Sequence, residues 1–421
     1  MMKTTLFFTV ITLCALTFAP LTFASLWDDY KLSQLRDPQR LQEHQARAIT
    51  YHGMAMKYVY SKLGNKPSSG YPLYIALHGG GGAPPSVNDS QWQHMQIYYR
   101  DSIKEGIYLA PRGVTNTWNL HFVDESYALY DRLIENMILF EDVDPNRVYI
   151  LGFSAGGDGI YQIAPRMNDR FAAVNMSAGH PNGVSLTNVY NLPFLLQVGE
   201  MDSAYNRNRV AAEYCGKLQE LHTRYAGGFV SECNIHYQRP HNFYDNDARE
   251  TLQKVLRSPA QWLRNNARTT VERNTNAIAW LKRFVRDPLP RRVVWDLQTR
   301  APRAGTHGQQ NYWLDIGSET VQSLGVQEIV AGYDFASNTI TIETPAPTYL
   351  KILLKQGMVD FSRDIRVIVN GESLFERVVV KQQTRRRTLL DRGDPNYIFD
   401  AALLLSNRTN ANGRWELSQV D

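Results

Sequence analysis

The middle of the chain, from about residue 70 to residue 256, alternates short apolar runs with longer amphipathic stretches. The runs at residues 73–77 and 107–110 are continuous, which is typical of strands that are buried on both faces of a sheet. The predicted strands are residues 73–77, 107–110, 148–151, 172–176, 194–198 and 235–238. The predicted helices are residues 124–139, 157–167, 206–225 and 247–256. Strands separated by helices in this way predict an α/β fold with a mostly parallel central sheet.

The segment before this pattern, residues 25–66, is rich in polar residues. Leu32, Leu35 and Leu41 recur there with helix-like spacing among Gln, Arg and Glu. This spacing predicts an N-terminal helical lead-in that packs on the main domain.

The segment that follows the pattern, residues 258–287, is predicted to be helical and polar, with Trp262, Trp280 and Phe284 as packing residues. Residues 287–292 contain two prolines and two arginines and are predicted to form a linker. We therefore assign residues 67–287 to the α/β domain.

Strand-like runs dominate the remaining residues, 288–421, and the alternation with helices stops. The runs lie at residues 292–297, 311–316, 339–344, 349–354, 365–369 and 374–380. Asn370-Gly371 separates the last two runs, and an Asn-Gly pair in this position predicts a hairpin turn. We expect a C-terminal all-β domain that resembles a sandwich.

The first 24 residues have the layout of a secretory signal peptide: Lys3, an apolar stretch over residues 6–21, and a small residue at Ala24. Cleavage after Ala24 predicts a secreted or periplasmic protein. The alternative is an uncleaved membrane anchor, since the stretch approaches spanning length. No other stretch is apolar enough to span a bilayer, so we expect no stable membrane span after cleavage.

Removal of the signal peptide takes away Cys14 and leaves Cys215 and Cys233. A pair of cysteines in an oxidising compartment predicts a disulfide, which would stabilise the fold by about 3 kcal/mol. Two buried thiols are the alternative.

The composition is that of an ordinary globular protein. The 421 residues are 43% hydrophobic and 20% charged, and the length suggests two domains. The formal net charge of +4 is small and gives no reason to expect nucleic acid as a partner. The ten histidines show no metal-binding spacing, so we expect no metal. We also expect no cofactor, because the chemistry considered below needs none.

Candidate chemistry begins with Gly152-Phe153-Ser154-Ala155-Gly156, directly between a predicted strand and a predicted helix. A sharp strand-to-helix turn exposes its serine, and the flanking residues must be small because a helix and a strand pass close by. We therefore predict that Ser154 is a nucleophile. A glycine-rich turn without catalytic function is the alternative.

A serine hydroxyl needs a base to take its proton and a carboxylate to orient that base. Asp202 and His241 follow later predicted strands in the order that this fold requires. Glu200 is an alternative acid. His236 is predicted to be a packed core residue inside its strand.

Two further residues near the predicted site have less direct predicted roles. His180 ends an earlier strand and is a candidate for lining the pocket. Asp158 is expected to point away from the loop face, as a carboxylate on the helix surface or behind the triad.

The third requirement is a pair of backbone amides that stabilise the oxyanion. One should come from Ala155, and the other from the glycine run of residues 79–82 that follows His78. A phosphate-binding loop is the alternative, but no Lys-Ser or Lys-Thr pair follows the glycines.

These motifs resemble the α/β-hydrolase superfamily, and in particular secreted polyhydroxybutyrate depolymerases and feruloyl esterases. They also resemble dienelactone-hydrolase and prolyl-oligopeptidase-like catalytic domains. The resemblance rests on residues 143–157, on the glycine run after His78, and on residues 111–118. It covers about residues 70–256 and implies a triad of Ser154, Asp202 and His241. It also implies that Gly80, Gly81 and Ala155 lie near the oxyanion.

Three functions are compatible with this sequence. The first is an esterase that acts on a small-molecule or polymeric ester through an acyl-enzyme, with residues 67–287 as its catalytic domain. The second is a serine peptidase of prolyl-oligopeptidase-like type that uses the same triad.

The third function is an inactive hydrolase scaffold whose C-terminal domain binds a carbohydrate or a cell surface. Candidate aromatic residues for that binding, which are more often core residues in β domains, are Trp295, Tyr312, Trp313, Tyr333 and Trp415.

Overall fold

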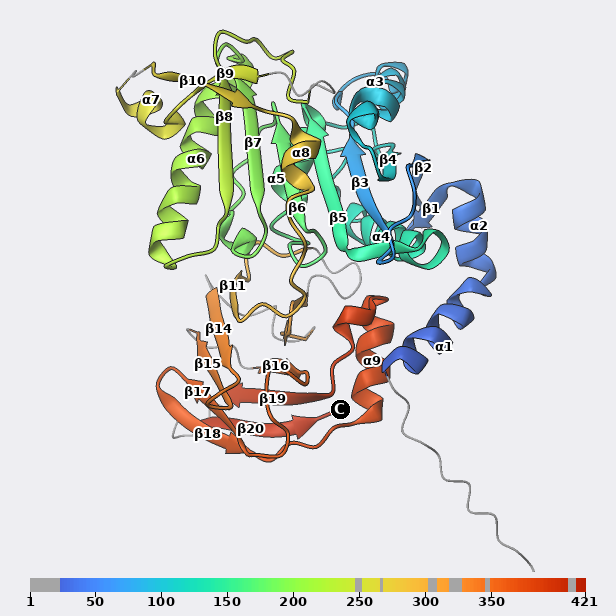
Figure 1. The fold of residues 1–421 in the computed structure, drawn as a ribbon, viewed down its shortest axis with the longest axis vertical. Helices are drawn as coiled ribbons and strands as arrows, with labels where there is room; N and C mark the ends of the chain where they lie inside the picture. The colour runs from blue at the N-terminus through green and yellow to red at the C-terminus, as the bar shows by residue number, and fades with distance from the viewer. Residues whose placement is uncertain are drawn as a thin grey trace, which may run out of the picture.

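A computed structural model gives the fold, and it describes residues 23–246, 252–265, 268–301, 309–317, 328–344, 349–407 and 414–421. The chain forms an α/β unit and, against one edge of it, a C-terminal β-rich unit (Figure 1). The signal-peptide prediction falls almost entirely outside the described residues. None of the helices in the described part of the chain has the length and apolar character needed to cross a membrane.

The α/β unit is built on a ten-stranded sheet of order β1-β2-β4-β3-β5-β6-β7-β8-β9-β10. Its six central strands are parallel, as predicted. They are β3 (Tyr71–Leu77), β4 (Gly106–Pro111), β5 (Val143–Phe153), β6 (Ala173–Ser177), β7 (Phe194–Gly199) and β8 (Ser231–His236). Antiparallel pairs complete both ends of the sheet.

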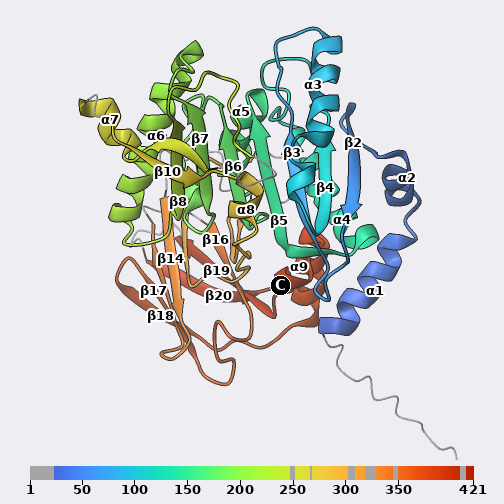
Figure 2. The same cartoon turned by 45° about the horizontal axis from the view of Figure 1, so that its top comes forward.

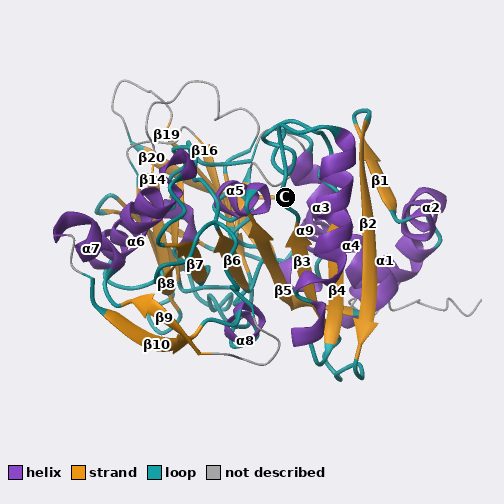
Figure 3. Ribbon diagram, turned by 90° about the horizontal axis from the view of Figure 1, so that it is seen from above, coloured by secondary structure: helices purple, strands orange, loops and turns teal. Residues whose placement is uncertain are grey.

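Both faces of the parallel strands are covered, which explains their continuous apolar sequences. On β3, Leu73, Ile75 and Leu77 belong to one core and Tyr74 and Ala76 to the other. The first core includes α4 (Ser126–Glu141), α5 (Ala155–Ile163) and α6 (Arg207–Arg224). The second includes α3 (Pro85–Tyr98) and α8 (Ala277–Leu281). Seen from above, α5 and α8 lie on opposite sides of the sheet (Figure 3).

The lead-in is only partly helical, which corrects the prediction for residues 25–66. It contains α1 (Phe23–Leu35) and α2 (Pro38–Ala46), followed by strands β1 (Ala48–Tyr51) and β2 (Met54–Leu63), which extend the central sheet. In β2 the buried Met56 and Tyr58 alternate with the exposed Ala55 and Lys57, a period of two that belongs to a strand with one covered face.

The packing residues of the lead-in also differ from those predicted. Leu32 and Leu41 are exposed, whereas Leu26 and Tyr30 of α1 are buried.

The segment after β8 is a hairpin of strands rather than helices alone. β9 (Leu252–Leu256) pairs with β10 (Thr270–Asn274), so the predicted helix at residues 247–256 is wrong where the structure describes it. α7 (Pro259–Asn265) lies between these strands, and α8 follows β10. The predicted packing role of Trp262 and Trp280 is confirmed, because both side chains are buried.

The C-terminal unit contains two five-stranded sheets around its own apolar core. The first has the order β11-β14-β15-β17-β18 and the second β12-β13-β16-β19-β20. The strands are β11 (Arg292–Asp296), β12 (Gln310–Asn311), β13 (Leu314–Asp315), β14 (Glu328–Asp334), β15 (Thr339–Glu343), β16 (Tyr349–Leu354), β17 (Ile365–Val369), β18 (Glu372–Glu376), β19 (Ala401–Asn407) and β20 (Trp415–Val420). The prediction of a β-rich domain is confirmed.

Two local features of this unit bear on the predictions. Asn370 and Gly371 connect β17 to β18 with φ angles of 48° and 90°, which is the hairpin turn that the sequence predicts. The expected all-β content is corrected by helix α9 (Gln382–Arg392). In Figure 2, α9 lies next to α1, and Leu389 of α9 packs in one cluster with Leu26 and Tyr30.

The candidate sugar-binding aromatics of the C-terminal unit are core residues. Trp295, Tyr312, Trp313 and Trp415 are all buried, and Tyr333 is partly buried against the same core. The first four therefore offer no surface on which a sugar ring could stack.

A network of buried charges joins the two units at the amino-terminal edge of the parallel strands. Arg392 of α9 contacts Asp169, with 2.9 Å between Nη2 and Oδ2. Arg286, which precedes the linker, contacts Asp394 at 2.6 Å. Arg170 donates to the backbone carbonyl of Arg392 at 2.7 Å. The linker therefore connects two units that share a buried interface.

Cys215 of α6 and Cys233 of β8 form a disulfide, with 6.1 Å between their Cα atoms. This is the predicted pairing. It ties α6 to the strand that precedes the His241 loop.

Candidate active site

Ser154 occupies a sharp turn between β5 and α5. Its φ of 59° and ψ of −122° are unfavourable for a residue with a side chain, and its amide donates to the carbonyl of Ser177 at 2.9 Å. Gly152 and Gly156, on either side of this turn, have no room for a side chain. A Cβ at Gly152 would lie 2.3 Å from the carbonyl oxygen of Gly156, and one at Gly156 would lie 2.2 Å from that of Leu77.

The structure brings Ser154, His241 and Asp202 together in one hydrogen-bonded chain. The distance from Ser154 Oγ to His241 Nε2 is 3.1 Å, and that from His241 Nδ1 to Asp202 Oδ2 is 2.7 Å. In this arrangement Nδ1–H donates to the carboxylate, and Nε2 accepts the proton of the serine hydroxyl. Asp202 is only 2% exposed, so the imidazole is held by a carboxylate that water does not reach.

The loop that carries Asp202 is hydrogen-bonded to the loop that carries His241. Met201 donates its amide to the carbonyl of Arg239 at 2.8 Å, and a Cβ at Gly199 would lie 2.2 Å from the carbonyl oxygen of Pro240. Glu200 accepts the amide of Gln238 at 3.0 Å. Of the two acids that the sequence offered, Asp202 therefore contacts His241, and Glu200 supports the backbone that leads to it.

The histidines that competed with His241 have other surroundings. His236 is buried between the side chains of Gln197 and Gln253, at 3.0 and 2.8 Å. Burial lowers the pKa of His236 to about 4, so it is a neutral core histidine, as expected. His180 lines a cavity beside Ala155, which confirms the position predicted for it.

The predicted orientation of Asp158 is wrong. Its side chain lines the same cavity as His180 and accepts the amide of His180 at 2.7 Å. Asp158 is on the first turn of α5, and that turn faces the cavity because Ser154 immediately precedes it. Burial raises the pKa of Asp158 to about 6.

The glycine run reaches Ser154. A Cβ at Gly79 would lie 3.3 Å from the Cβ of Ser154, and Gly80 and Gly81 line a cavity together with Ala155. The amide of Gly81 is already bonded, because it donates to Asn88 Oδ1 at 2.8 Å. This bond occupies the Gly81 amide, and the placement of Gly80, Gly81 and Ala155 near an oxyanion stays a prediction. No acceptor for the Gly80 amide lies within the described part of the chain.

His78 shapes the glycine run from behind. Its Nδ1 lies 2.6 Å from the carbonyl of Gly79, and its Nε2 accepts the amide of Gly113 at 3.0 Å. Burial lowers the pKa of His78 to about 4, which keeps the ring neutral for both bonds.

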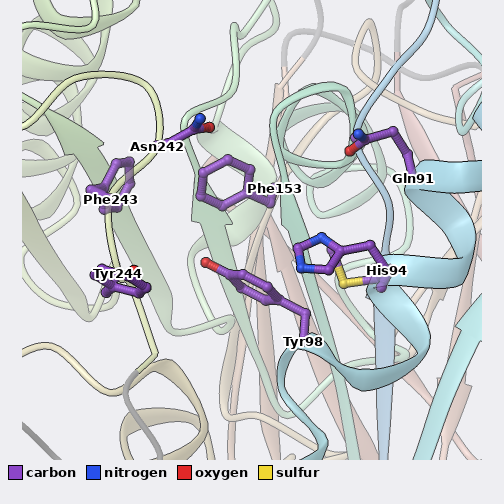
Figure 4. Close-up of a pocket in the computed structure, with 9 residues that line it drawn as sticks. Gln91, His94, Tyr98, Phe153, Asn242, Phe243 and Tyr244 are labelled. Atoms are coloured by element: carbon purple, nitrogen blue, oxygen red, sulfur yellow. The ribbon is translucent and has the colours of Figure 1, made fainter. Parts of the chain in front are cut away.

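Two cavities flank Ser154. The first, of about 410 Å³, is largely aromatic, and it is lined by Gly79, Gln91, His94, Met95, Tyr98, Phe153, Asn242, Phe243 and Tyr244 (Figure 4). The second, of about 280 Å³, contains several polar and charged side chains. It is lined by Gly80, Gly81, Trp118, Ala155, Asp158, His180, Asn182, Tyr205 and Arg207. The two residues next to Ser154 in the sequence therefore line different cavities: Phe153 lines the first and Ala155 lines the second.

Several residues of the site have no recognisable signal in the sequence. Asn88 and Tyr98 lie on α3, far along the chain from Ser154, and Arg207 begins α6 with its guanidinium 3.8 Å from Asp202. Only the folded sheet brings them to the site. In the described residues, no three His, Cys, Asp or Glu side chains are grouped so that they could hold a metal ion.

No protein-family model and no curated protein sequence matches this chain. Similar solved structures include a thermostable esterase, with 19% identity and a TM-score of 0.39. That match covers 57% of this chain and 62% of the esterase, so this chain spans less than two thirds of its length.

Two further similar structures are a carboxylesterase from Bacillus cereus and a putative dienelactone hydrolase from Klebsiella pneumoniae subsp. pneumoniae. The carboxylesterase is 15% identical, with a TM-score of 0.35 and coverage of 49% of this chain and 92% of that one. The dienelactone hydrolase is 15% identical, with a TM-score of 0.36 and coverage of 56% and 96%. The strand order and the serine turn between β5 and α5 are those of an α/β-hydrolase fold with an added β-rich unit.

Proposed function

We propose that this protein is a serine hydrolase that cleaves carboxylic esters through Ser154, His241 and Asp202. The observation that carries the proposal is the hydrogen-bonded chain of these three side chains beside two cavities. A serine on a strained turn, a histidine within hydrogen-bond reach and a buried carboxylate behind it are the parts that acyl transfer needs.

In the first half of the reaction, Ser154 Oγ attacks the ester carbonyl while His241 Nε2 takes the hydroxyl proton. The tetrahedral intermediate collapses, the carbon–oxygen bond to the alcohol breaks, and His241 returns the proton to the leaving alkoxide. Asp202 stabilises the positive imidazole between these steps. A water molecule then attacks the acyl-enzyme by the same route and releases the acid.

We assign the oxyanion donors to the amides of Ala155 and Gly80. Ala155 follows the nucleophile, and Gly80 lines the same cavity as Ala155. The φ of 106° at Gly80 belongs to a conformation that glycine adopts readily, and a Cβ there would lie 2.3 Å from Asn88 Oδ1. Asn88 holds Gly81 and thereby shapes the loop around Gly80.

The same machinery attacks amides, so a peptidase is the second candidate. We favour esters because an alkoxide is a better leaving group than an amide anion and an ester carbonyl is less stabilised by resonance than an amide carbonyl, so a given serine nucleophile cleaves an ester faster than the matched amide. The cavities on both sides of Ser154 provide room for the acyl part and the alcohol part. We also propose that the protein acts outside the cytoplasm, on the strength of its apolar N-terminus and its disulfide.

The test is hydrolysis of short-chain aryl esters, with matched peptide anilides alongside. Wild-type protein should turn over the esters and react with a fluorophosphonate probe, and Ser154→Ala should lose both activities while it keeps its circular dichroism spectrum. Ser231→Ala, which changes an exposed serine at the start of β8, is the control and should retain both. Equal ester turnover by Ser154→Ala would refute the proposal, and faster cleavage of the anilides would establish the peptidase.

A further inference from the structure

A buried carboxylate lies four residues beyond His241, outside the triad. Asp245 is fully buried and accepts three hydroxyl groups. Tyr98 donates to Oδ1 at 2.8 Å, Tyr99 donates to Oδ2 at 2.6 Å, and Ser177 also donates to Oδ2. No Lys, Arg or His of the described chain forms a salt bridge with it. Within the described residues, the side chains that donate to Asp245 are therefore all neutral.

Two of these donors, Ser177 and Tyr98, belong to elements that form the site. Ser177 ends β6, and its carbonyl accepts the amide of Ser154 at 2.9 Å. Ser177 therefore bonds to the nucleophile turn through its backbone and to Asp245 through its side chain. Tyr98 ends α3 and forms part of the aromatic cavity, where its ring centroid lies 5.9 Å from that of Phe153.

The backbone of Asp245 is fixed as well. Its carbonyl accepts the amide of Ala277 at 3.1 Å and the side-chain amide of Gln197 at 3.2 Å. At the other end of the loop, the carbonyl of Arg239 accepts the amide of Met201. The segment between these two attachments carries His241, so its position depends on both.

The attachment at Asp245 fixes two aromatic side chains of the loop, His241 and Phe243, against Phe153. His241 lies edge-on to Phe153, with 5.6 Å between ring centroids, and Phe243 lies 5.6 Å from the same ring. Figure 4 shows Phe243 and Tyr244 facing Phe153 and Tyr98 across the cavity. A shift of the loop would move the base away from Ser154 Oγ and open this cavity at the same time.

We propose that Asp245 is a positioning residue that holds the His241 loop in register with the nucleophile turn, through Ser177 on one side and Tyr98 and Tyr99 on the other. The inference rests on the proposed function. Asp245 touches neither the substrate nor the reacting atoms, and it acts through the placement of His241. Displacement of a catalytic group by about 1 Å can reduce the rate on the order of 10²-fold.

The test compares Asp245→Asn with wild type in steady-state hydrolysis of a short-chain aryl ester. The asparagine keeps the volume of the side chain but has a single acceptor oxygen for three hydroxyl donors. We expect kcat to fall on the order of 10²-fold and KM to change by less than about threefold, because the loss falls on the chemical step. The rate of labelling by a fluorophosphonate should fall by the same factor as kcat.

A pair of tyrosine variants serves as the matched comparison. Tyr99→Phe deletes one donor to Asp245, and Tyr108→Phe deletes an equally buried hydroxyl that donates instead to the carbonyl of Met95. Both rings belong to the same apolar cluster. We expect Tyr99→Phe to lower kcat by about tenfold, whereas Tyr108→Phe should lower only the thermal midpoint.

The proposal is overturned if folded Asp245→Asn keeps a kcat close to that of wild type. It is equally overturned if Tyr108→Phe lowers kcat as much as Tyr99→Phe does, because the effect would then be one of general packing. If Asp245→Asn does not fold, the tyrosine pair decides the question. Failure of the wild-type protein to turn over esters or to react with the probe would refute the proposed function instead.

Discussion

The two edges of the central sheet use buried charge in opposite ways. At the carboxyl-terminal edge, Asp202 faces the ring of His241 at 2.7 Å, and the nearest guanidinium is 3.8 Å away. At the amino-terminal edge, Asp394 lies 2.6 Å from Arg286 and 3.7 Å from Arg170. The first carboxylate is placed where it can stabilise a proton on a neighbouring ring. The second is neutralised by permanent cations and holds two units together.

This comparison also places the C-terminal unit. It packs against the edge opposite the candidate site (Figure 1), through buried ion pairs and the cluster that α9 shares with α1. We expect it to act as part of the folded body rather than as a module on a tether. Changes at the site edge should therefore alter catalysis, and changes at the interface edge should alter stability.

The largest effect is expected at the site edge, for Asp202→Asn. The amide keeps the size of the side chain but cannot hold His241 in the tautomer that accepts the serine proton. We expect kcat for an aryl ester to fall about 10⁴-fold with little change in the unfolding midpoint. Glu200→Gln is the matched control, because the Glu200 carboxylate accepts the backbone amide of Gln238 and lies 3.7 Å from the Arg268 side chain, away from the ring of His241. A loss from Glu200→Gln as large as that from Asp202→Asn would contradict the assignment of the acid.

At the interface edge, Arg392→Met should act on stability alone. It removes the cation that Asp169 contacts at 2.9 Å and leaves that carboxylate buried. We expect the free energy of unfolding to fall by about 3–5 kcal/mol, measured by urea denaturation. The kcat of the folded variant should match wild type. A large loss of kcat without a loss of stability would show that the two edges are coupled.

Loss of the disulfide should have a somewhat smaller effect on stability. Replacement of Cys215 and Cys233 together by Ser should lower the free energy of unfolding by about 3 kcal/mol, because the unfolded chain gains freedom. Mass measurement after alkylation, with and without reductant, checks that the bond is present in the purified protein. Two alkylated thiols in the native protein would contradict the pairing.

The smallest effect is expected for the pH dependence of the free energy of unfolding, to which Asp158 and Asp394 contribute with opposite sign. Burial raises the pKa of Asp158 above its ordinary value, to about 6. Because the folded state binds this proton more tightly, the contribution of Asp158 to stability is present below about pH 4. It is lost as the pH rises through 6, and it amounts to at most about 3 kcal/mol.

Asp394 should show the opposite dependence. Burial alone would raise its pKa, but Arg286 and Arg170 hold the pKa of Asp394 below its ordinary value. Its contribution is therefore present above the ordinary pKa and is lost as the pH falls. Urea unfolding from about pH 2 to pH 7 of Asp158→Asn and Asp394→Asn, each compared with wild type, measures both, because this range extends below the ordinary pKa of Asp394. Differences that run in the same direction would contradict this contrast between the edges.

The parts of the fold that follow from short-range pattern were predictable. Apolar runs identified β3 to β7, because a strand covered on both faces contains few polar residues. The prediction for β8, residues 235–238, overlaps the observed strand only at Ile235 and His236, because the first part of β8 is polar. Asn370-Gly371 identified its hairpin, because both residues accept positive φ. In contrast, β2 and β9 are half-covered strands with charged residues such as Lys57 and Lys254, and their weak alternation was hidden among polar neighbours.

Helix α9 could not be predicted for a related reason. Its sequence is dominated by arginine and polar residues, so it has little apolar periodicity of its own. The helix buries Leu389 against α1 and Arg392 against Asp169, and both partners come from distant parts of the chain. Such contacts leave no local signal.

The sequence by itself determined the order of the candidate residues: Ser154 on a glycine-flanked turn, then Asp202, then His241, each after a strand. Spacing of this kind is local, because each residue is placed by the strand that precedes it. Only the tertiary structure decided which acid meets His241, that Gly81 is bonded to Asn88, that Asp158 faces a cavity, and that Asp245 joins the base loop to the nucleophile turn. These are contacts between segments far apart in the chain, and the packing of the sheet and its loops sets their distances.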